Sequence, residues 1–202
     1  MKKDKKSNIY KSKMTIATLG NKAALDVIDY TSEKPLCVTD LYIKARREQA
    51  EMSLILRGMK SIGAVTDKRD GKFIYYEPNF KRIKAIEKFM LKLIEHSPTI
   101  QKTVLYNSPY DASYDILQTM WRFEVILNFL HKAVKPHKVS SIYSRLKIEE
   151  SICSQALAGL RRIGIVTVQQ NGKERLYTLN REMYSKIINT VNEFVNDKHP
   201  AE

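Results

Sequence analysis

The chain carries one long pattern twice, and this internal repeat limits the folds open to it more than any other feature. Residues 53–79 read SLILRGMKSIGAVTDKRDGKFIYYEPN, and residues 154–180 read SQALAGLRRIGIVTVQQNGKERLYTLN. Matching residues keep a constant offset of 101 positions without a gap, as between Gly58 and Gly159. A constant register of this kind indicates tandem duplication of a unit of about 80 residues. Such a unit has the size of a small domain rather than of a solenoid repeat, so two domains are expected.

Each copy predicts the same order of elements: three helices, a β-hairpin and a last helix. The third helices are expected at 49–61 and 150–162, where apolar residues recur at helical spacing and a glycine follows shortly after. Asp-Gly at 70–71 and Asn-Gly at 171–172 predict tight hairpin turns, because such turns require positive φ. The predicted fold class is mainly α with small β-hairpins (α+β), as two tandem winged helix-turn-helix domains.

The remaining elements follow from apolar stripes and from prolines. Earlier helices are expected around 21–33 and 121–133, short helices at 38–45 and 139–146, and closing amphipathic helices at 80–96 and 181–195. Trp121 and Phe123 are expected in the core. The predicted domains are 14–96 and 113–197, with a linker at 97–112 and a flexible basic arm at 1–13.

The charge of the chain favours an anionic partner. Its 202 residues hold 35 Lys and Arg against 22 Asp and Glu, a net charge of +13, which suits nucleic acid more often than a membrane surface. No apolar run reaches the roughly 18 residues of a membrane span, and no apolar stretch follows the basic start as in a secretory signal. With Cys37 and Cys153 alone, a reduced, cytoplasmic chain with no membrane partner is expected.

Three segments carry a resemblance to a known family. QAEMSLILRGMKSIGAV (Gln49–Val65) resembles the recognition helix of the ArsR (arsenical-repressor) type of winged-helix regulator, and ESICSQALAGLRRIGIV (Glu150–Val166) matches the same pattern. LCVTDL (Leu36–Leu41) resembles the segment that leads into the second helix of that family. The resemblance implies a transcriptional regulator that binds double-stranded DNA.

Outward-facing polar and basic side chains are the predicted DNA contacts. Inward positions of the third helices are expected at Met52, Leu56, Met59, Cys153, Leu157 and Leu160, so the opposite face meets the major groove and the hairpin cations meet phosphate or the minor groove. The predicted contact residues are Lys44, Arg46, Arg47, Gln49, Ser53, Arg57, Lys68, Arg69, Lys72, Arg145, Lys147, Ser151, Ser154, Gln155, Lys173 and Arg175. Arg161 and Arg162 are expected to complement a helix dipole.

Neither catalysis nor a resident cofactor is expected. Family sensors often place paired cysteines in the segment before the second helix, but Cys37 has no close His or Cys partner in the sequence. One thiol is a poor site for a soft metal, so no metal is predicted and Cys37 is expected to be a small buried side chain. There is no phosphate-cradling glycine loop and no Ser-His-Asp arrangement, so the chain is not expected to be an enzyme.

The duplication suggests why a regulator of this type would carry two copies. Single-unit members bind DNA as two-fold dimers, so a duplicated chain is expected to act as a monomeric pseudo-dimer or to form a homodimer. Because the reading faces differ, an asymmetric site is expected. Two other functions remain open: a tandem winged-helix protein-interaction module, which the acidic helix starts and Leu54 would fit, and a replication initiator of plasmid or phage type, which would share every DNA-binding feature.

Overall fold

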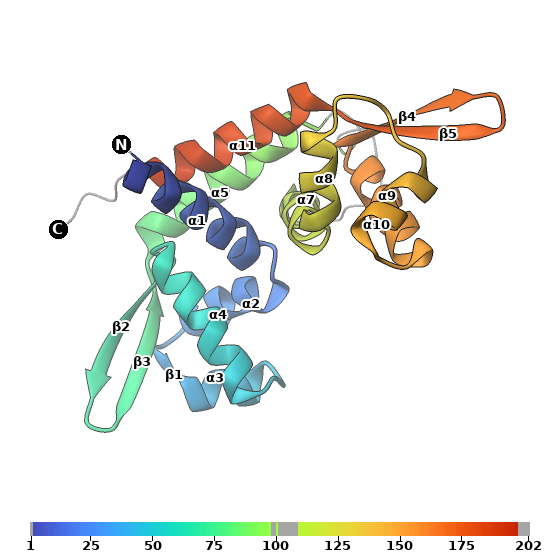
Figure 1. Ribbon diagram of the computed structural model, residues 1–202. Helices are drawn as coiled ribbons and strands as arrows, with labels where there is room; N and C mark the ends of the chain where they lie inside the picture. The colour runs from blue at the N-terminus through green and yellow to red at the C-terminus, as the bar shows by residue number, and fades with distance from the viewer. Residues whose placement is uncertain (1, 98–99, 101–108, 198–202) are drawn as a thin grey trace. The chain divides into compact units, whose positions relative to one another are not determined.

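The computed structural model describes residues 2–97, 100 and 109–197, which are mainly helical with small antiparallel sheets (Figure 1). This confirms the predicted α+β class. By their contacts the described residues form two units, one holding 2–90 with 191–197 and the other holding the remainder. The predicted domains follow the repeat rather than contacts, and their boundaries stay a prediction. Of the predicted linker, residues 98–99 and 101–108 lie outside the described residues.

The first unit contains five helices among its described residues and one three-stranded sheet. The helices are α1 (Lys2–Leu19), α2 (Lys22–Ser32), α3 (Val38–Lys44), α4 (Gln49–Ser61) and α5 (Phe80–Glu95), the last of which runs past the unit boundary. The strands are β1 (Leu36–Cys37), β2 (Val65–Asp70) and β3 (Phe73–Pro78), in the order β1-β3-β2.

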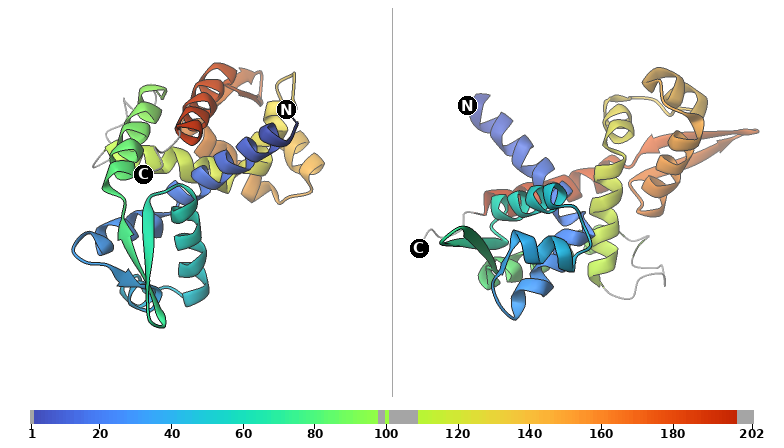
Figure 2. Two further views of the ribbon diagram at one scale, coloured as in Figure 1. Left: turned by 90° about the vertical axis from the view of Figure 1, so that its left-hand side faces the viewer. Right: turned by 90° about the horizontal axis from the view of Figure 1, so that it is seen from below.

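The second unit repeats this order with a smaller sheet. Its helices are α7 (Pro109–Arg122), α8 (Glu124–Lys132), α9 (Val139–Leu146), α10 (Glu150–Arg162) and α11 (Arg181–Asn196), whose end belongs to the first unit. Strands β4 (Val166–Asn171) and β5 (Glu174–Leu179) form an antiparallel hairpin. In both units the hairpin extends beyond the helices (Figures 1 and 2).

The 101-residue offset of the sequence repeat also relates the bounds of the helices and strands and the pairing of the strands. Elements α4, β2, β3 and α5 begin and end 101 residues before α10, β4, β5 and α11. Leu36 pairs with Tyr76 in the first unit, and His137 pairs with Tyr177 at the same offset in the second. The second unit has only this single bridge where the first has β1. The copies therefore share one local architecture.

The predicted hairpins are confirmed, with the turn one residue later than the dipeptides suggest. Asp70 pairs with Phe73, so the two turn residues are Gly71 and Lys72. Gly71 has φ +57° and Gly172, in the second hairpin, has φ +60°. A glycine with positive φ at the first of two turn positions is the arrangement of a type II′ turn, which matches the twist of the flanking strands.

Helices α4 and α10 bury one side completely, as their apolar spacing predicts. The expected inward residues are at most 1% exposed: Met52, Leu56 and Met59 in α4, and Cys153, Leu157 and Leu160 in α10. Burying each such side chain stabilises the fold by about 1.5–3 kcal/mol relative to leaving it in water. Both helices therefore have a fixed rotation, and their opposite faces must point to solvent.

The N-terminal segment corrects one expectation. Residues 1–13 are predicted to be a flexible arm, but helix α1 begins at Lys2 and continues to Leu19. Its buried side mixes polar Thr15 and Thr18 with Ile16 and Leu19, so no apolar period marks it in the sequence. Propensity supports the helix, because Lys is a good helix former.

Trp121 corrects a second expectation. It is 47% exposed, in the last turn of α7, whereas the sequence suggests a core position. Helix α7 ends at Arg122, and α8 starts afresh after Phe123, which is half-buried. The apolar stripe of α8 therefore does not extend back to Trp121.

Glycine allows α1 to approach α4. A Cβ atom placed on Gly58 would lie 2.5 Å from Oγ1 of Thr18, closer than such atoms come in folded proteins. In the second unit a Cβ on Gly159 would lie 3.1 Å from the ring of Phe123. The repeat keeps this glycine because a preceding helix crosses close to the helix backbone in both copies.

We expect Gly58→Ala to destabilise the chain although alanine favours helices. Overpacking costs about 1–3 kcal/mol, more than the roughly 1 kcal/mol gained in helix propensity. Urea unfolding would measure the change in the free energy of unfolding. The double variant Gly58→Ala with Thr18→Ala should recover most of the loss, since the clashing side chain is gone. Additive effects of the two substitutions would contradict the close approach.

A buried arginine joins three segments of the first unit. Arg82 of α5 is 5% exposed, and its Nε donates to the carbonyl of Ile62 at 2.9 Å. A terminal nitrogen donates to the carbonyl of Phe194 at 3.2 Å, and the guanidinium lies 3.8 Å from the centre of the Phe194 ring. Phe194 also stacks on Phe89, with ring centres 4.6 Å apart. Arg82 thereby ties the end of α4 to α5 and to the end of α11.

Replacing Arg82 should be among the costly single changes in the first unit. We expect Arg82→Ala to lower the free energy of unfolding by about 2–4 kcal/mol, because two charge-assisted hydrogen bonds and a cation–π contact are lost. Lys81→Ala is the matched control: its side chain is exposed, so the change should stay within about 0.5 kcal/mol. Equal effects of the two variants in urea unfolding would contradict this role.

Candidate nucleic-acid interface

Short turns before α4 and α10 present the first group of predicted contact residues. Arg46 follows α3 with φ +52°, and Lys147 follows α9 with φ +54°, a left-handed conformation that is uncommon outside glycine. The two residues are equivalent under the 101-residue offset, so both turns have a left-handed residue at the same place. Lys44, Arg46 and Arg47 are exposed around the first turn, and Arg145 and Lys147 around the second.

The outward faces of α4 and α10 hold the second group. Gln49 and Arg57 are exposed on α4, with Ser53 half-buried between them. Ser151, Ser154 and Gln155 are exposed on α10. The expected direction of these side chains is therefore confirmed, while their binding of DNA stays a prediction.

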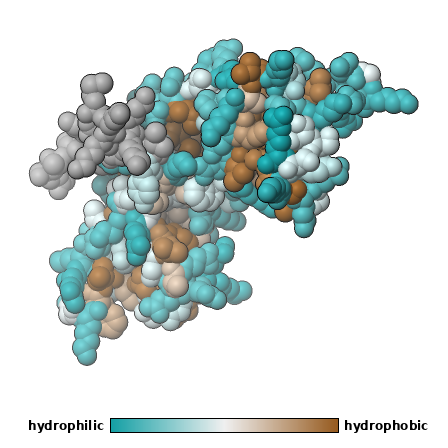
Figure 3. All heavy atoms as spheres, viewed as in Figure 1, coloured by the Kyte–Doolittle hydropathy of each residue, from teal (hydrophilic) through white to brown (hydrophobic). Residues whose placement is uncertain are grey.

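The hairpins hold the third group at their outer ends. Lys68 and Arg69 are exposed on β2, and Lys72 occupies the first turn. In the second hairpin Lys173 occupies the equivalent turn position, and Arg175 is exposed on β5. Figure 3 shows hydrophilic surface over both hairpin ends, with apolar surface also present on the first. Phe73 and Ile74, which are 53% and 41% exposed, belong to that first hairpin.

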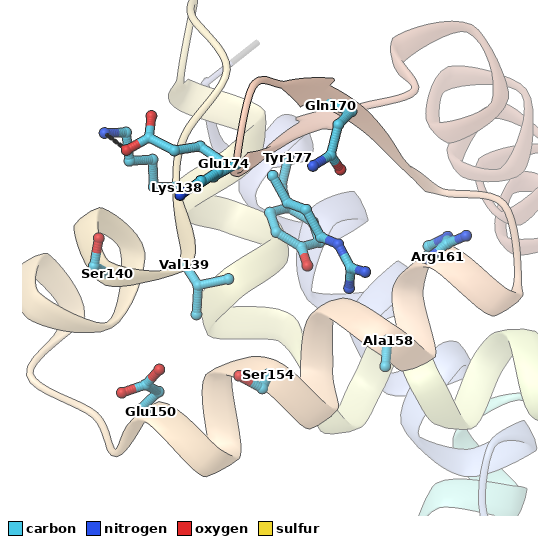
Figure 4. Close-up of a pocket in the computed structure, with 12 residues that line it drawn as sticks. Lys138, Val139, Ser140, Glu150, Ser154, Ala158, Arg161, Gln170, Glu174 and Tyr177 are labelled. Atoms are coloured by element: carbon cyan, nitrogen blue, oxygen red, sulfur yellow. Dashed lines mark hydrogen bonds and ion pairs between the residues drawn. The ribbon is translucent and has the colours of Figure 1, made fainter.

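A groove of about 790 Å³ lies between α10 and the second hairpin. Figure 4 shows Tyr177 pointing from the hairpin into the groove, with Arg161 near one end of α10 and Glu150 at the other. The lining residues are Lys138, Val139, Ser140, Glu150, Ser154, Ala158, Arg161, Gln170, Lys173, Glu174, Arg175 and Tyr177. The groove thus brings together three predicted residues, Ser154, Lys173 and Arg175.

The lining of the groove carries more positive than negative charge. Glu174 forms an ion pair with Lys138, so these two charges offset each other. The side chains of Arg161, Lys173 and Arg175 have no ion-pair or hydrogen-bond partner among the described residues. Three uncommitted cations against one carboxylate make this groove suited to an anion.

The first unit differs at the equivalent positions. Lys60 takes the place of Arg161, and its Nζ lies 2.6 Å from a carboxylate oxygen of Asp67 on β2. The second unit has Val168 where the first has Asp67, which leaves Arg161 without that partner. A smaller groove of about 500 Å³ follows the first hairpin and is lined by Pro35, Lys68, Arg69, Asp70, Tyr75 and Glu77.

Several predicted contact residues are already engaged within the chain. Arg47 pairs with Glu51 at 3.1 Å on the surface of α4, and the Lys44 ammonium lies 5.0 Å from the centre of the Tyr30 ring. The hydroxyl of Ser53 donates to the carbonyl of Gln49 at 2.9 Å. The Arg47–Glu51 pair is exposed on both sides and therefore weak, about 0–1 kcal/mol, so a phosphate can compete for Arg47.

Both cysteines are buried packing residues, as expected for Cys37. The Cys37 thiol and backbone N–H donate to a carboxylate oxygen of Asp40 at 3.1 and 3.2 Å, and these bonds lower the pKa of Asp40. Burial raises the pKa of the Cys153 thiol, and Glu150 adds to the effect. Within the described residues no three His, Cys, Asp or Glu side chains are grouped to hold a metal ion.

His137 anchors the second hairpin to the start of α9. It exchanges two backbone hydrogen bonds with Tyr177, of 3.0 and 2.8 Å, and its ring lies 5.1 Å from that of Phe129. Burial lowers the pKa of His137, and the positive charge of Arg145 lowers it further. The backbone hydrogen bonds of His137 therefore hold Tyr177 at the groove, while its ring packs on Phe129.

Comparisons with known proteins do not place the chain in a family. No protein-family model matches it, and no curated protein matches it at a significant level. None of the described helices is long and apolar enough to cross a membrane.

Two residues of the groove, Arg161 and Tyr177, are not among the predicted contact residues. Arg161, which the sequence predicts to complement a helix dipole, lines the groove together with Tyr177 of β5. The offset of 101 offered a signal for Arg161, since it aligns this residue with Lys60 and Val168 with Asp67. The alignment does not show that Lys60 and Asp67 meet, because they lie on different elements and pair only in the folded chain.

We expect His137 to titrate below its ordinary pKa of about 6.5. Arg145→Ala should raise the pKa without restoring it fully, because burial is the larger cause. Since the folded pKa is lowered, the stability from His137 is present above the unfolded pKa and is lost as pH falls through the folded value. NMR titration of the imidazole protons measures both effects, with Lys147→Ala as control. An unchanged midpoint in Arg145→Ala would exclude that arginine as a cause.

Proposed function

We propose that the chain is a sequence-specific double-stranded DNA-binding transcriptional regulator, in which each copy is a winged helix-turn-helix domain. One observation carries this proposal: a helix with a buried inner side presents a polar outer face beside a cation-bearing hairpin, and this arrangement occurs twice at one register. Helices of this kind enter the major groove, and hairpin cations meet phosphates or the minor groove. The resemblance to ArsR-type regulators and the net charge of +13 support the same reading.

Helix α4 carries two side chains suited to base reading, and α10 carries Gln155. Gln49 and Arg57 are both exposed, and their side chains can pair bidentately with adenine and guanine edges. Exposed cations precede and follow this helix in the sequence: Arg46 comes before it, and Lys68 and Lys72 come after it. They are suited to contacts with phosphates that flank the bases read by the helix. We propose that the chain represses transcription by occupying a promoter.

The duplication supports a pseudo-dimer within one chain. Two copies of the same turn, helix and hairpin provide in one molecule what single-unit regulators obtain by pairing two chains. The copies differ at most outward positions, as between Arg57 and Ala158, so the bound site is asymmetric.

Selection from random duplexes by the full chain, at near-physiological salt, tests this function. An asymmetric motif should be enriched, and Arg57→Ala should weaken preference at one base position by about 1–3 kcal/mol. Salt must be fixed because a basic chain binds any DNA when screening is low. Failure of the folded chain to enrich any motif would remove the regulator from consideration.

Exposed apolar side chains favour one other function, a protein-interaction module. Leu54 on α4 and Ile43 on α3 are each 62% exposed, near the predicted DNA contacts. Large exposed apolar residues are typical of protein-binding surfaces. If DNA is the partner, Leu54→Ser should leave the base preferences set by Gln49 and Arg57 unchanged, because Leu54 can contact only a thymine methyl group.

A further inference from the structure

The two copies differ in the side chains that they present for base reading and for phosphate binding. The inference drawn from this difference rests on the proposed function. At the two positions where α4 carries the side chains that can pair bidentately with bases, Gln49 and Arg57, α10 carries Glu150 and Ala158. Glu150 is a carboxylate at the start of the helix, and Ala158 is too short to reach a base edge. Both line the second groove, so α10 lacks these two readers at the groove, and its exposed amide, Gln155, lies outside the lining.

Two of the three uncommitted cations in the second groove, Arg161 and Arg175, are paired or absent at the equivalent positions of the first copy, while Lys173 has its counterpart in Lys72. In the first copy, Nζ of Lys60 lies 2.6 Å from a carboxylate oxygen of Asp67. The second copy has Val168 at the position of Asp67, so Arg161, the counterpart of Lys60, has no such partner. Val168 pairs across the hairpin with Tyr177, just as Asp67 pairs with Tyr76, so the two positions are equivalent in the sheet. On β5, Arg175 replaces the apolar Ile74 of the first copy.

Hydroxyl and amide groups complete the lining around these cations. Ser154, Gln170 and Tyr177 all line the groove, and Figure 4 shows Tyr177 and Gln170 at the end of the groove nearer to Arg161. Cations with hydroxyl and amide donors are the groups that bind phosphate oxygens in protein–DNA complexes. The only other unpaired charge in the lining, Glu150, lies at the opposite end of α10.

We propose that the second groove grips the DNA backbone through Arg161, Lys173 and Arg175 without reading bases, while the first copy supplies the sequence preference. The preferred motif then has one strongly specified half and one half that is selected weakly. Arg161 becomes a phosphate-binding residue rather than a complement to the helix dipole.

Binding of Arg161→Ala to the selected duplex and to a scrambled duplex, across a range of salt concentrations, tests the assignment. A single lost phosphate contact reduces the slope of log K against log salt by about 0.9, which corresponds to about fivefold weaker binding at 0.15 M salt. Both duplexes should lose affinity by the same factor, and the selected motif should not change. Arg57→Ala should instead lower the ratio of selected to scrambled binding by about 5- to 150-fold.

A neighbouring arginine provides the control. Arg162 lies in the same last turn of α10, but its guanidinium pairs with Asp115 at 2.6 Å. Arg162→Ala should therefore leave the salt slope and DNA affinity unchanged. Arg161→Lys should keep both close to wild type, since a cation remains.

A second variant keeps Arg161 but gives its side chain an ion-pair partner. Val168→Asp copies the first-copy arrangement and should tie Arg161 in an ion pair, weakening both duplexes equally. The reciprocal Asp67→Val should free Lys60 and strengthen both. Circular dichroism confirms that each variant is folded.

The outcomes separate the possible failures. If Arg161→Ala changes which bases are enriched, α10 reads sequence and the division is wrong. If it lowers stability but not affinity, Arg161 serves only the helix end and the phosphate site is wrong. If the wild-type chain selects no duplex at all, the regulator function itself fails, a result that none of the variants can mimic.

Discussion

Helices α4 and α10 each bury one side against a preceding helix, and a glycine permits the contact. Helix α1 approaches α4 so closely at Gly58 that a Cβ atom there would clash with Thr18. At the equivalent position in the second unit, Gly159 packs against the ring of Phe123. With the inner residues of both helices almost fully buried, neither helix can rotate without exposing its apolar side. The direction of every outward side chain, and hence the candidate interface, depends on this packing.

The repeated element bounds show how strictly the local architecture was kept while the surface changed. Turn, helix and hairpin return at one offset, including the left-handed residues Arg46 and Lys147 and the pairing of His137 with Tyr177. Backbone geometry and core are therefore common to both copies. Charge and reading residues are not, because solvent-facing positions tolerate substitution at little cost in stability. A duplicated domain can in this way keep one scaffold and acquire two surfaces.

The ends of the closing helices give the duplication a structural role as well. Residues 191–196 of α11 belong to the first unit, where Phe194 stacks on Phe89 and takes a hydrogen bond from Arg82. Within the second unit, His96 lies 2.9 Å from the hydroxyl of Thr190, and Ser97 donates to the carbonyl of Ile163 at 2.9 Å. Each unit is thus completed by the end of a helix that begins in the other copy, so neither copy has its full core alone.

Periodicity and turn chemistry in the sequence determined the α+β class, the bounds of α4 and α10, their inner residues and both hairpins. These features are local. Apolar residues at helical spacing over thirteen residues predict a helix, and an Asn-Gly dipeptide predicts a hairpin turn. Only the tertiary structure decided that α1 is a helix, since its buried side includes Thr15 and Thr18, and that Trp121 faces solvent. It alone decided that Arg161 is free while Lys60 is not. Partners in an ion pair come from elements that meet only in the folded chain, so no local pattern encodes them.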